Sequence, residues 1–188
     1  GGDKGIFGFG STGSVSSLTN LVSNTGVVAS DTAGVGTARR NLGATEYGGD
    51  KGIFGYGTTG SNSSLTNLVS NVGVVSADVT GVGTARQTVG GCGYGYDKGI
   101  FGFGFGTVYS VTNLISNVGV VGDDVTGVGT AREGAKATQY GGDKGIFAYG
   151  YTTTNVSMSN LVSNTGVVGT DVTGVGTVRR STNACSFN

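Results

Sequence analysis

Hydrophobic and polar positions follow the same order four times along this chain. Apolar pairs such as Ile-Phe, Leu-Val and Val-Val recur between stretches rich in Gly, Ser, Thr and Asn. The string Asp-Lys-Gly-Ile-Phe starts at Asp3, Asp50, Asp97 and Asp143, at steps of 47, 47 and 46 residues. A fixed period of this length marks a repeat architecture. We therefore expect four copies of one unit, at residues 1–47, 48–94, 95–140 and 141–188, folded together as a single domain.

Each copy contains four strand candidates, which in the first copy are residues 5–10, 17–23, 27–30 and 37–47. In the first of them, the period of two places Ile6 on one face and Phe7 and Phe9 on the other. The sequence Asn-Thr-Gly at 24–26 suits a tight hairpin turn. Gly34 and Gly36 mark a bend before the fourth candidate. No segment has a helical period, so the pattern predicts an all-β fold built from four-stranded repeats.

Apolar residues on both faces of the first strand favour a sheet that is covered on both sides, as in a β-propeller blade. Eight residues after the repeated Arg of each copy, at 39, 86, 132 and 179, stand aromatic residues, at Tyr47, Tyr94, Tyr140 and Phe187. A strand ending at Phe187 could pair with the strand near Gly5 and leave no free sheet edge. We therefore expect a closed four-bladed β-propeller, with an open solenoid as the alternative.

Two resemblances accompany this pattern. An Arg, a variable strand ending in Tyr, a tight turn and then Lys-Gly-Ile-Phe-Gly-Tyr-Gly at 51–57 resemble the kelch repeat, which implies a propeller. Kelch blades usually carry a Trp, and this chain has none. The string Thr-Asn-Leu-Val-Ser-Asn-Thr-Gly-Val-Val at 19–28 is similar to repeats in tail-fibre and structural proteins of aquatic bacterial viruses. That similarity implies an extracellular or virion-surface setting.

Composition narrows the classes of function. Lys plus Arg and Asp plus Glu number 11 each, so no net field attracts nucleic acid or an anionic membrane surface. No apolar run is long enough for membrane insertion, and Gly1 in place of Met indicates a processed or excised chain. The absence of His removes the commonest general base and the usual zinc ligand. We expect a non-enzymatic protein without a cofactor.

One glycine motif is misleading. Residues 8–13 and 55–60 match the Gly-x-Gly-x-x-Gly fingerprint of dinucleotide sites. That fingerprint works by presenting a helix N-terminus to pyrophosphate, and here a β-hairpin follows instead. We therefore expect no nucleotide at either place.

Most charged residues occupy repeated positions, two acids and two bases in each copy. We expect them to form a structural ring of ion pairs between and within blades, because an active site needs asymmetry that a repeated set lacks. A ring of carboxylates that holds a cation is the alternative. The residues are Asp3, Lys4, Asp31, Arg39, Asp50, Lys51, Asp78, Arg86, Asp97, Lys98, Asp124, Arg132, Asp143, Lys144, Asp171 and Arg179.

The two cysteines lie in alternate copies, Cys92 in the second and Cys185 in the fourth. A disulfide requires Cα atoms within about 7 Å of each other. We expect two small unbridged thiols, either buried or lining a central channel.

The segments that differ most between copies are 11–16, 58–63, 105–110 and 151–156. Variable loops rich in Ser, Thr, Asn and Tyr on a constant scaffold are typical of recognition surfaces, although unconstrained surface drift would look similar. The candidate ligand-binding residues are Asn62, Tyr109, Tyr151 and Asn155. The predicted function is recognition of a cell-surface glycan or receptor by an extracellular or virion-surface module. The alternative is a structural subunit that self-associates into a fibre or filament.

Overall fold

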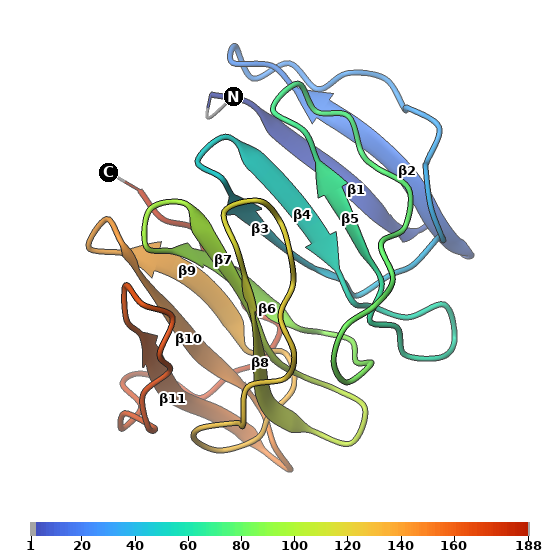
Figure 1. The fold of residues 1–188 in the computed structure, drawn as a ribbon. Coiled ribbons are helices and arrows are strands. Elements are labelled where there is room, and N and C mark those ends of the chain that lie inside the picture. Colours follow the sequence, from blue (N-terminus) through green and yellow to red (C-terminus); the bar gives the residue numbers. More distant parts are fainter. Residues whose placement is uncertain (1–2, 188) are drawn as a thin grey trace.

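The protein is a series of four antiparallel sheets, each packed on the next (Figure 1). The computed structural model describes residues 3–187, and these residues form strands, turns and loops without a helix. The all-β prediction is therefore confirmed. The strands are β1 (Gly5–Ser11), β2 (Val15–Val22), β3 (Gly43–Tyr47), β4 (Lys51–Gly55), β5 (Thr66–Val69), β6 (Gly90–Tyr94), β7 (Lys98–Gly104), β8 (Tyr109–Ile115), β9 (Lys136–Tyr140), β10 (Lys144–Tyr151) and β11 (Asn155–Val162).

The sheets cross the boundaries of the sequence repeats. The first sheet contains β1 and β2 alone, and the others have the orders β3-β4-β5, β6-β7-β8 and β11-β10-β9. In each three-stranded sheet, the strand that comes first in the chain is the end of the preceding repeat. For example, β3 from the first repeat pairs with β4 from the second, in the register Gly43↔Gly55 to Tyr47↔Lys51. Each repeat is thereby tied to the next through backbone hydrogen bonds.

The prediction of four strands per repeat is wrong. Residues 27–30 lie along the edge of β2, where they form the isolated bridge Val22↔Val28 and a hydrogen bond from Ala29 N to the Leu21 carbonyl in place of a strand, and Val27 and Val28 are more than half exposed. The candidate strand 37–47 is a strand only at Gly43–Tyr47, because Arg39 turns toward the next sheet and Asn41 adopts a φ of 58°. The described sheets hence have two or three strands.

The expected pairing of the C-terminal strand with the N-terminal blade is not formed in residues 3–187. There β1 pairs with β2 on one edge, and residues 183–187 are not part of a strand. The first sheet lies at one end of the series and the sheet containing β11 at the other (Figure 1). No strand pairing therefore closes the series of sheets within the described residues.

An aromatic residue with an unusual backbone conformation occupies the same position in every repeat, and in three repeats it lies at a bulge. Register shifts occur at Gly8/Gly10, Gly102/Gly104 and Ala148/Gly150. The aromatic residue at each of these three places, and Tyr56 directly after β4, has a left-handed φ of 60–63°, a conformation uncommon for residues with a side chain. These residues are Phe9, Tyr56, Phe103 and Tyr149. This backbone conformation directs their rings toward the Arg series described below.

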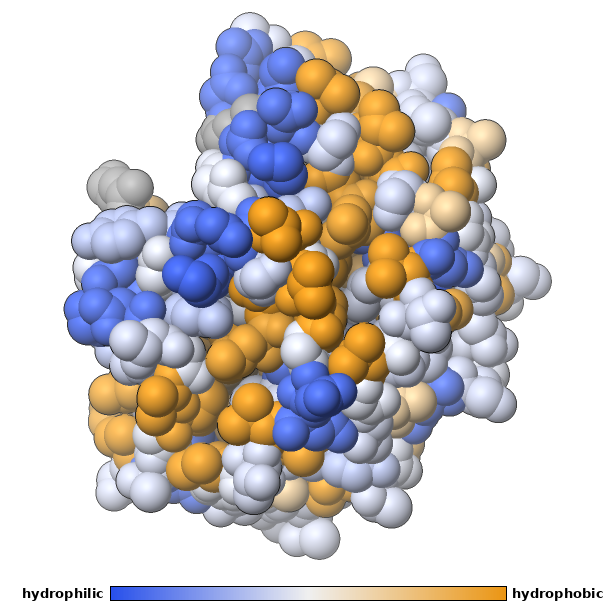
Figure 2. Space-filling view, viewed as in Figure 1, coloured by the Kyte–Doolittle hydropathy of each residue, from blue (hydrophilic) through white to orange (hydrophobic). Residues whose placement is uncertain are grey.

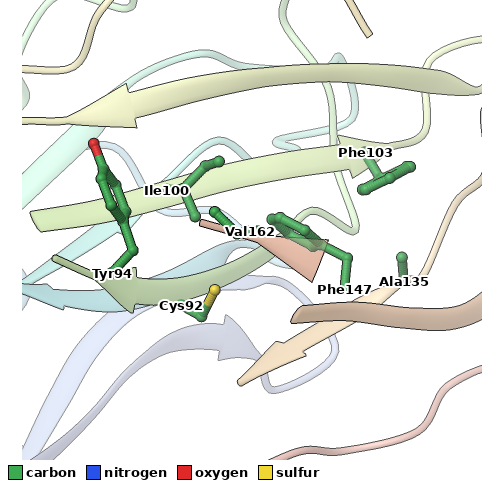
Figure 3. Packing of buried hydrophobic residues seen from close by; sticks show 7 residues of the cluster. All are labelled: Cys92, Tyr94, Ile100, Phe103, Ala135, Phe147 and Val162. Carbon is green, nitrogen blue, oxygen red and sulfur yellow. The ribbon is translucent and has the colours of Figure 1, made fainter. Parts of the chain in front are cut away.

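The sheets approach closely because a glycine of one faces a phenylalanine of the next. A Cβ built on Gly55 would lie 2.7 Å from the ring of Phe101, and one on Gly102 would lie 2.8 Å from the ring of Phe147. Both rings are fully buried. Figure 3 shows the core between the third and fourth sheets, where Phe147 lies among residues of β6 and β7. Glycine thus allows the aromatic side chains to form the core.

Candidate functional site

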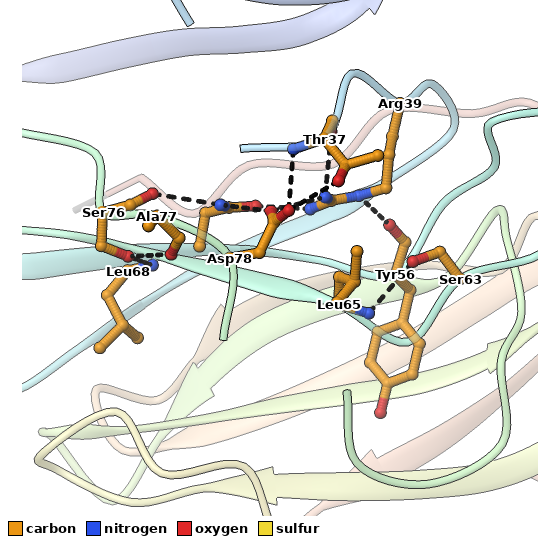
Figure 4. Close-up of polar contacts among 10 residues, drawn as sticks. Thr37, Arg39, Tyr56, Ser63, Leu65, Leu68, Ser76, Ala77 and Asp78 are labelled. Carbon is orange, nitrogen blue, oxygen red and sulfur yellow. Dashed lines mark hydrogen bonds and ion pairs between the residues drawn. The ribbon is translucent and has the colours of Figure 1, made fainter. Parts of the chain in front are cut away.

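The charged repeat positions build a clamp between consecutive sheets, best seen at Arg39 (Figure 4). This guanidinium is fully buried, and its Nη2 donates a hydrogen bond of 2.6 Å to Asn67 Oδ1. Its Nε donates to the carbonyl of Tyr56 at 3.0 Å, and its Nη1 lies 3.2 Å from Asp78 Oδ1. The ring of Phe9 covers it, with Cζ 4.9 Å from the ring centroid. Arg39 thereby joins its own sheet to the following one.

The same clamp recurs at the next two junctions. Arg86 donates to Asn113 Oδ1 at 2.6 Å and Arg132 donates to Asn160 Oδ1 at 2.7 Å. Asp124 and Asp171 lie 3.8 and 3.9 Å from these guanidinium groups. Buried charges require such partners, because an unpaired one costs several kcal/mol.

The clamp also determines the charge state of its carboxylates. Burial alone would raise the pKa of Asp78, but hydrogen bonds from Thr37, Asn67 and Arg39 outweigh it and hold the pKa below the ordinary 3.8. The pKa values of Asp124 and Asp171 are lowered in the same way. Burial lowers the pKa of Arg132 to about 10 against the attraction of Asp171. Each clamp is therefore an ion pair at neutral pH.

The Asp-Lys residues of the second, third and fourth copies pair locally, at the turns that precede β4, β7 and β10. The distances between Lys Nζ and Asp Oδ1 are 2.8 Å for Lys51 and Asp50 and 3.3 Å for Lys98 and Asp97, and Lys144 pairs with Asp143 at 2.8 Å. These side chains and the clamps form a ladder along the series of sheets.

The two ends of this ladder are incomplete within residues 3–187. Asn20 donates to Asp31 Oδ1 at 2.8 Å, as the corresponding residues do elsewhere, but no Arg meets them. Arg179 stacks 4.1 Å over the ring of Tyr149, is exposed, and donates to its neighbour, the carbonyl of Thr177. Sequence reasoning placed all four Arg residues in one closed set and missed this difference.

The variable loops lie on one side of the series, away from the two termini (Figure 1). Two of the four candidate binding residues come together: Asn62 donates to the carbonyl of Phe105 at 3.2 Å, and it and Tyr109 both lie beside Gly106. Tyr151 and Asn155 face each other across the β10–β11 hairpin. The guanidinium of Arg180 covers Tyr151 at 4.5 Å. The structure thus brings the four residues together as two pairs.

A groove of about 500 Å³ opens between the first and second sheets. Its apolar lining includes Ile6, Leu21 and Val69, and its charged lining comes from Lys4, Glu46 and the Asp50–Lys51 turn. Figure 2 shows that apolar residues also form a broad band across the surface facing the viewer. Sequence reasoning did not predict this groove, because it depends on which strand is missing from the first sheet.

Both cysteines are free thiols, as expected, but their environments differ. Cys92 is buried, and burial raises its pKa to about 12. Cys185 is exposed and lines the same small hollow as Cys92, so of the two expected environments, buried or channel-lining, it does not have the buried one.

Among residues 3–187, no three His, Cys, Asp or Glu side chains gather closely enough to hold a metal ion. In the same range, no helix has the length and apolarity needed to cross a membrane.

No protein-family model matches this chain, and a search of curated proteins found no significant match.

Proposed function

We propose that this chain is a non-enzymatic binding module that recognises a cell-surface glycan or receptor through its variable loops. The supporting observation is that the repeated residues and the variable residues lie in different places and make different contacts. The repeated charges are engaged in clamps between sheets and in turns, whereas the residues that differ between copies lie together on one side. A constant scaffold that carries variable loops is the usual arrangement of recognition proteins.

Asn62 and Tyr109 are the residues that we assign to the contact. Asn62 is held by the carbonyl of Phe105, and Tyr109 lies beside it on the next hairpin. A tyrosine ring offers a stacking surface for a sugar, and an amide offers directed hydrogen bonds to hydroxyl groups. The similarity to viral tail-fibre repeats supports an extracellular or virion-surface setting.

The closed four-bladed ring belongs to this proposal as one arrangement of the scaffold. It requires residues 183–187 to pair with the outer edge of β1 and the fourth sheet to meet the first. The kelch resemblance supports this ring, and the lack of a closing strand pair among the described residues supports the alternative solenoid.

Binding of the purified chain to a glycan array and to candidate host cells tests this function. Tyr109→Ala should reduce binding by at least about tenfold, as expected when a stacking residue is lost. Tyr96→Ala is the matched control, because Tyr96 is 77% exposed and lies in the β6–β7 turn, on the opposite side. Absence of binding to every glycan and cell tested, or equal losses in both variants, would contradict the proposal.

The second candidate function is a structural subunit of a fibre or filament. It is supported by a separate observation, the incomplete clamps at the two ends of the ladder.

A further inference from the structure

The two ends of the molecule carry complementary halves of the junction that is complete between consecutive sheets. At each internal junction an Arg of one repeat meets an Asn and an Asp of the next. Asn20 and Asp31 form the accepting half without an Arg, and Arg179 is an Arg without the accepting half. Together, the two halves contain the same three residue types, Arg, Asn and Asp, as one internal clamp.

The backbone shows the same relation. Within residues 3–187 the outer edge of β1 has no partner, while β4, β7 and β10 each pair with the end of the preceding repeat. The corresponding end of the last repeat is 183–187, which pairs with no strand. Residues 183–186 line small hollows together with residues of β3, β6 and β9, the first strands of the three three-stranded sheets. It thus continues the series of first strands and is available for pairing.

The groove between the first and second sheets supplies a third match. At the next junction Tyr47 lies beside Leu68 and the turn glycine Gly119, and it is almost fully buried. The equivalent groove is lined by Leu21 and Gly73, but the strand that would bring an aromatic residue is missing. In the last repeat the residue equivalent to Tyr47 is Phe187, which is 93% exposed. The groove is therefore the vacant site of such an aromatic side chain.

We propose that a second copy of this chain fills these places, so that residues 179–187 of one copy complete the first sheet of another. Arg179 would bind Asn20 and Asp31, residues 183–187 would pair with β1, and Phe187 would enter the groove. This association is head to tail, and repetition of such a contact builds an open filament unless its rotation closes a ring. The inference does not depend on the loop function.

Within residues 3–187 the chain does not fill these surfaces itself. The first and fourth sheets lie at opposite ends of the series (Figure 1). Phe101, Phe147, Arg86 and Arg132 are fully buried at the junctions between them. Closely packed interiors resist deformation, so bringing the ends together within one chain would disturb these junctions. A second copy can dock without changing any of them.

One residue weakens the contact between copies. In the register of the central strands, Ala148 occupies the position of Gly8, Gly55 and Gly102, which face the phenylalanine of the next sheet. The phenylalanine of the first sheet is Phe7, which is 64% exposed. The Cβ of Ala148 would press against that ring. Ala148→Gly is therefore expected to strengthen association.

Sedimentation velocity over a series of protein concentrations tests the proposal. The wild-type chain should form larger species as its concentration rises. Arg179→Gln and Phe187→Ser, which alter exposed residues at one end, should each weaken association by about tenfold or more. Arg180→Gln is the matched control, because Arg180 stacks on Tyr151 of its own repeat, and it should associate like the wild type.

A mixing experiment identifies the two surfaces. Asp31→Asn impairs the accepting half and Arg179→Gln the donating half, so each variant alone should remain mostly monomeric. Their mixture retains one intact junction and should give one-to-one pairs and nothing larger. A wild-type chain that stays monomeric at every concentration would overturn the proposal. If Arg179→Gln also lowered the melting temperature of that monomer, the ends would meet within one chain.

Discussion

Arg86 donates a hydrogen bond of 2.6 Å to the side-chain oxygen of Asn113, which lies 27 residues later and in the following sheet. The same guanidinium stacks 4.2 Å above Tyr56 and donates to the carbonyl of Phe103. One side chain thus contacts two neighbouring sheets and closes their junction. Repetition of this contact explains why a glycine-rich chain of 188 residues can pack its sheets in series.

The close approach of the sheets makes Gly55 sensitive to substitution. Gly55→Ala would place a Cβ 2.7 Å from the buried Phe101 ring, so it should destabilise the protein by about 1–3 kcal/mol. Urea denaturation measures this change. Ala148→Gly, at the equivalent position of the last sheet, is the control and should change the stability of the monomer by no more than about 1 kcal/mol. Equal losses in the two variants would show that packing against the next sheet is not the cause.

The clamps should also make stability depend on acid. The folded-state pKa values of Asp78, Asp124 and Asp171 lie below the ordinary 3.8, so these groups stabilise the protein above that pH. Their contribution is lost as the pH falls through the lowered values. The melting temperature should therefore be steady near neutrality and fall below about pH 4.

Asp78→Asn tests the origin of that acid effect. The variant lacks one titrating carboxylate, so its melting temperature should be lower at neutral pH and should fall less steeply below about pH 4. If wild type and variant lost stability in parallel through the acid range, Asp78 would not contribute to the acid sensitivity.

The two thiols should react at very different rates. Cys92 is buried and has a pKa near 12, so it carries almost no thiolate at neutral pH, whereas Cys185 is exposed. A thiol-specific reagent should modify one cysteine in the dilute native protein and both in denaturant. Cys185→Ser should leave the native protein unreactive. Rapid modification of Cys92 in that variant would mean that the junction between the third and fourth sheets opens readily.

Much of the scaffold follows from local sequence patterns. The spacing of Asp-Lys-Gly-Ile-Phe predicts four units, and alternation in residues 5–10 predicts the strand that the structure shows as β1. The repeated charges include Arg39 and Asp78, which form an ion pair between consecutive repeats. These features depend on residues close in the chain or on their repetition.

The features that the sequence did not reveal depend on contacts between repeats. Residues 27–30 have apolar side chains like a strand, but beside β2 they form only an isolated bridge and single backbone hydrogen bonds instead of a continuous strand. The strand ending at Tyr47 belongs to the sheet of the following repeat, which local periodicity cannot indicate. The left-handed backbone at Phe9 is also unexpected for an aromatic residue, and it is what positions the ring against Arg39. The vacant groove and the unmatched Arg179 follow from these contacts.

The most direct measurement is the free energy of unfolding of Arg86→Gln compared with that of Arg179→Gln, in dilute protein. Arg86 is fully buried in a complete clamp and Arg179 is exposed, although both occupy the same position in the repeat. Arg86→Gln should cost about 2–4 kcal/mol, less than a fully buried pair because the Asp124 side chain is 28% exposed. Arg179→Gln should cost less than about 0.5 kcal/mol. Equal losses would contradict the assignment of these arginines to junctions between consecutive sheets, complete at Arg86 and open at Arg179.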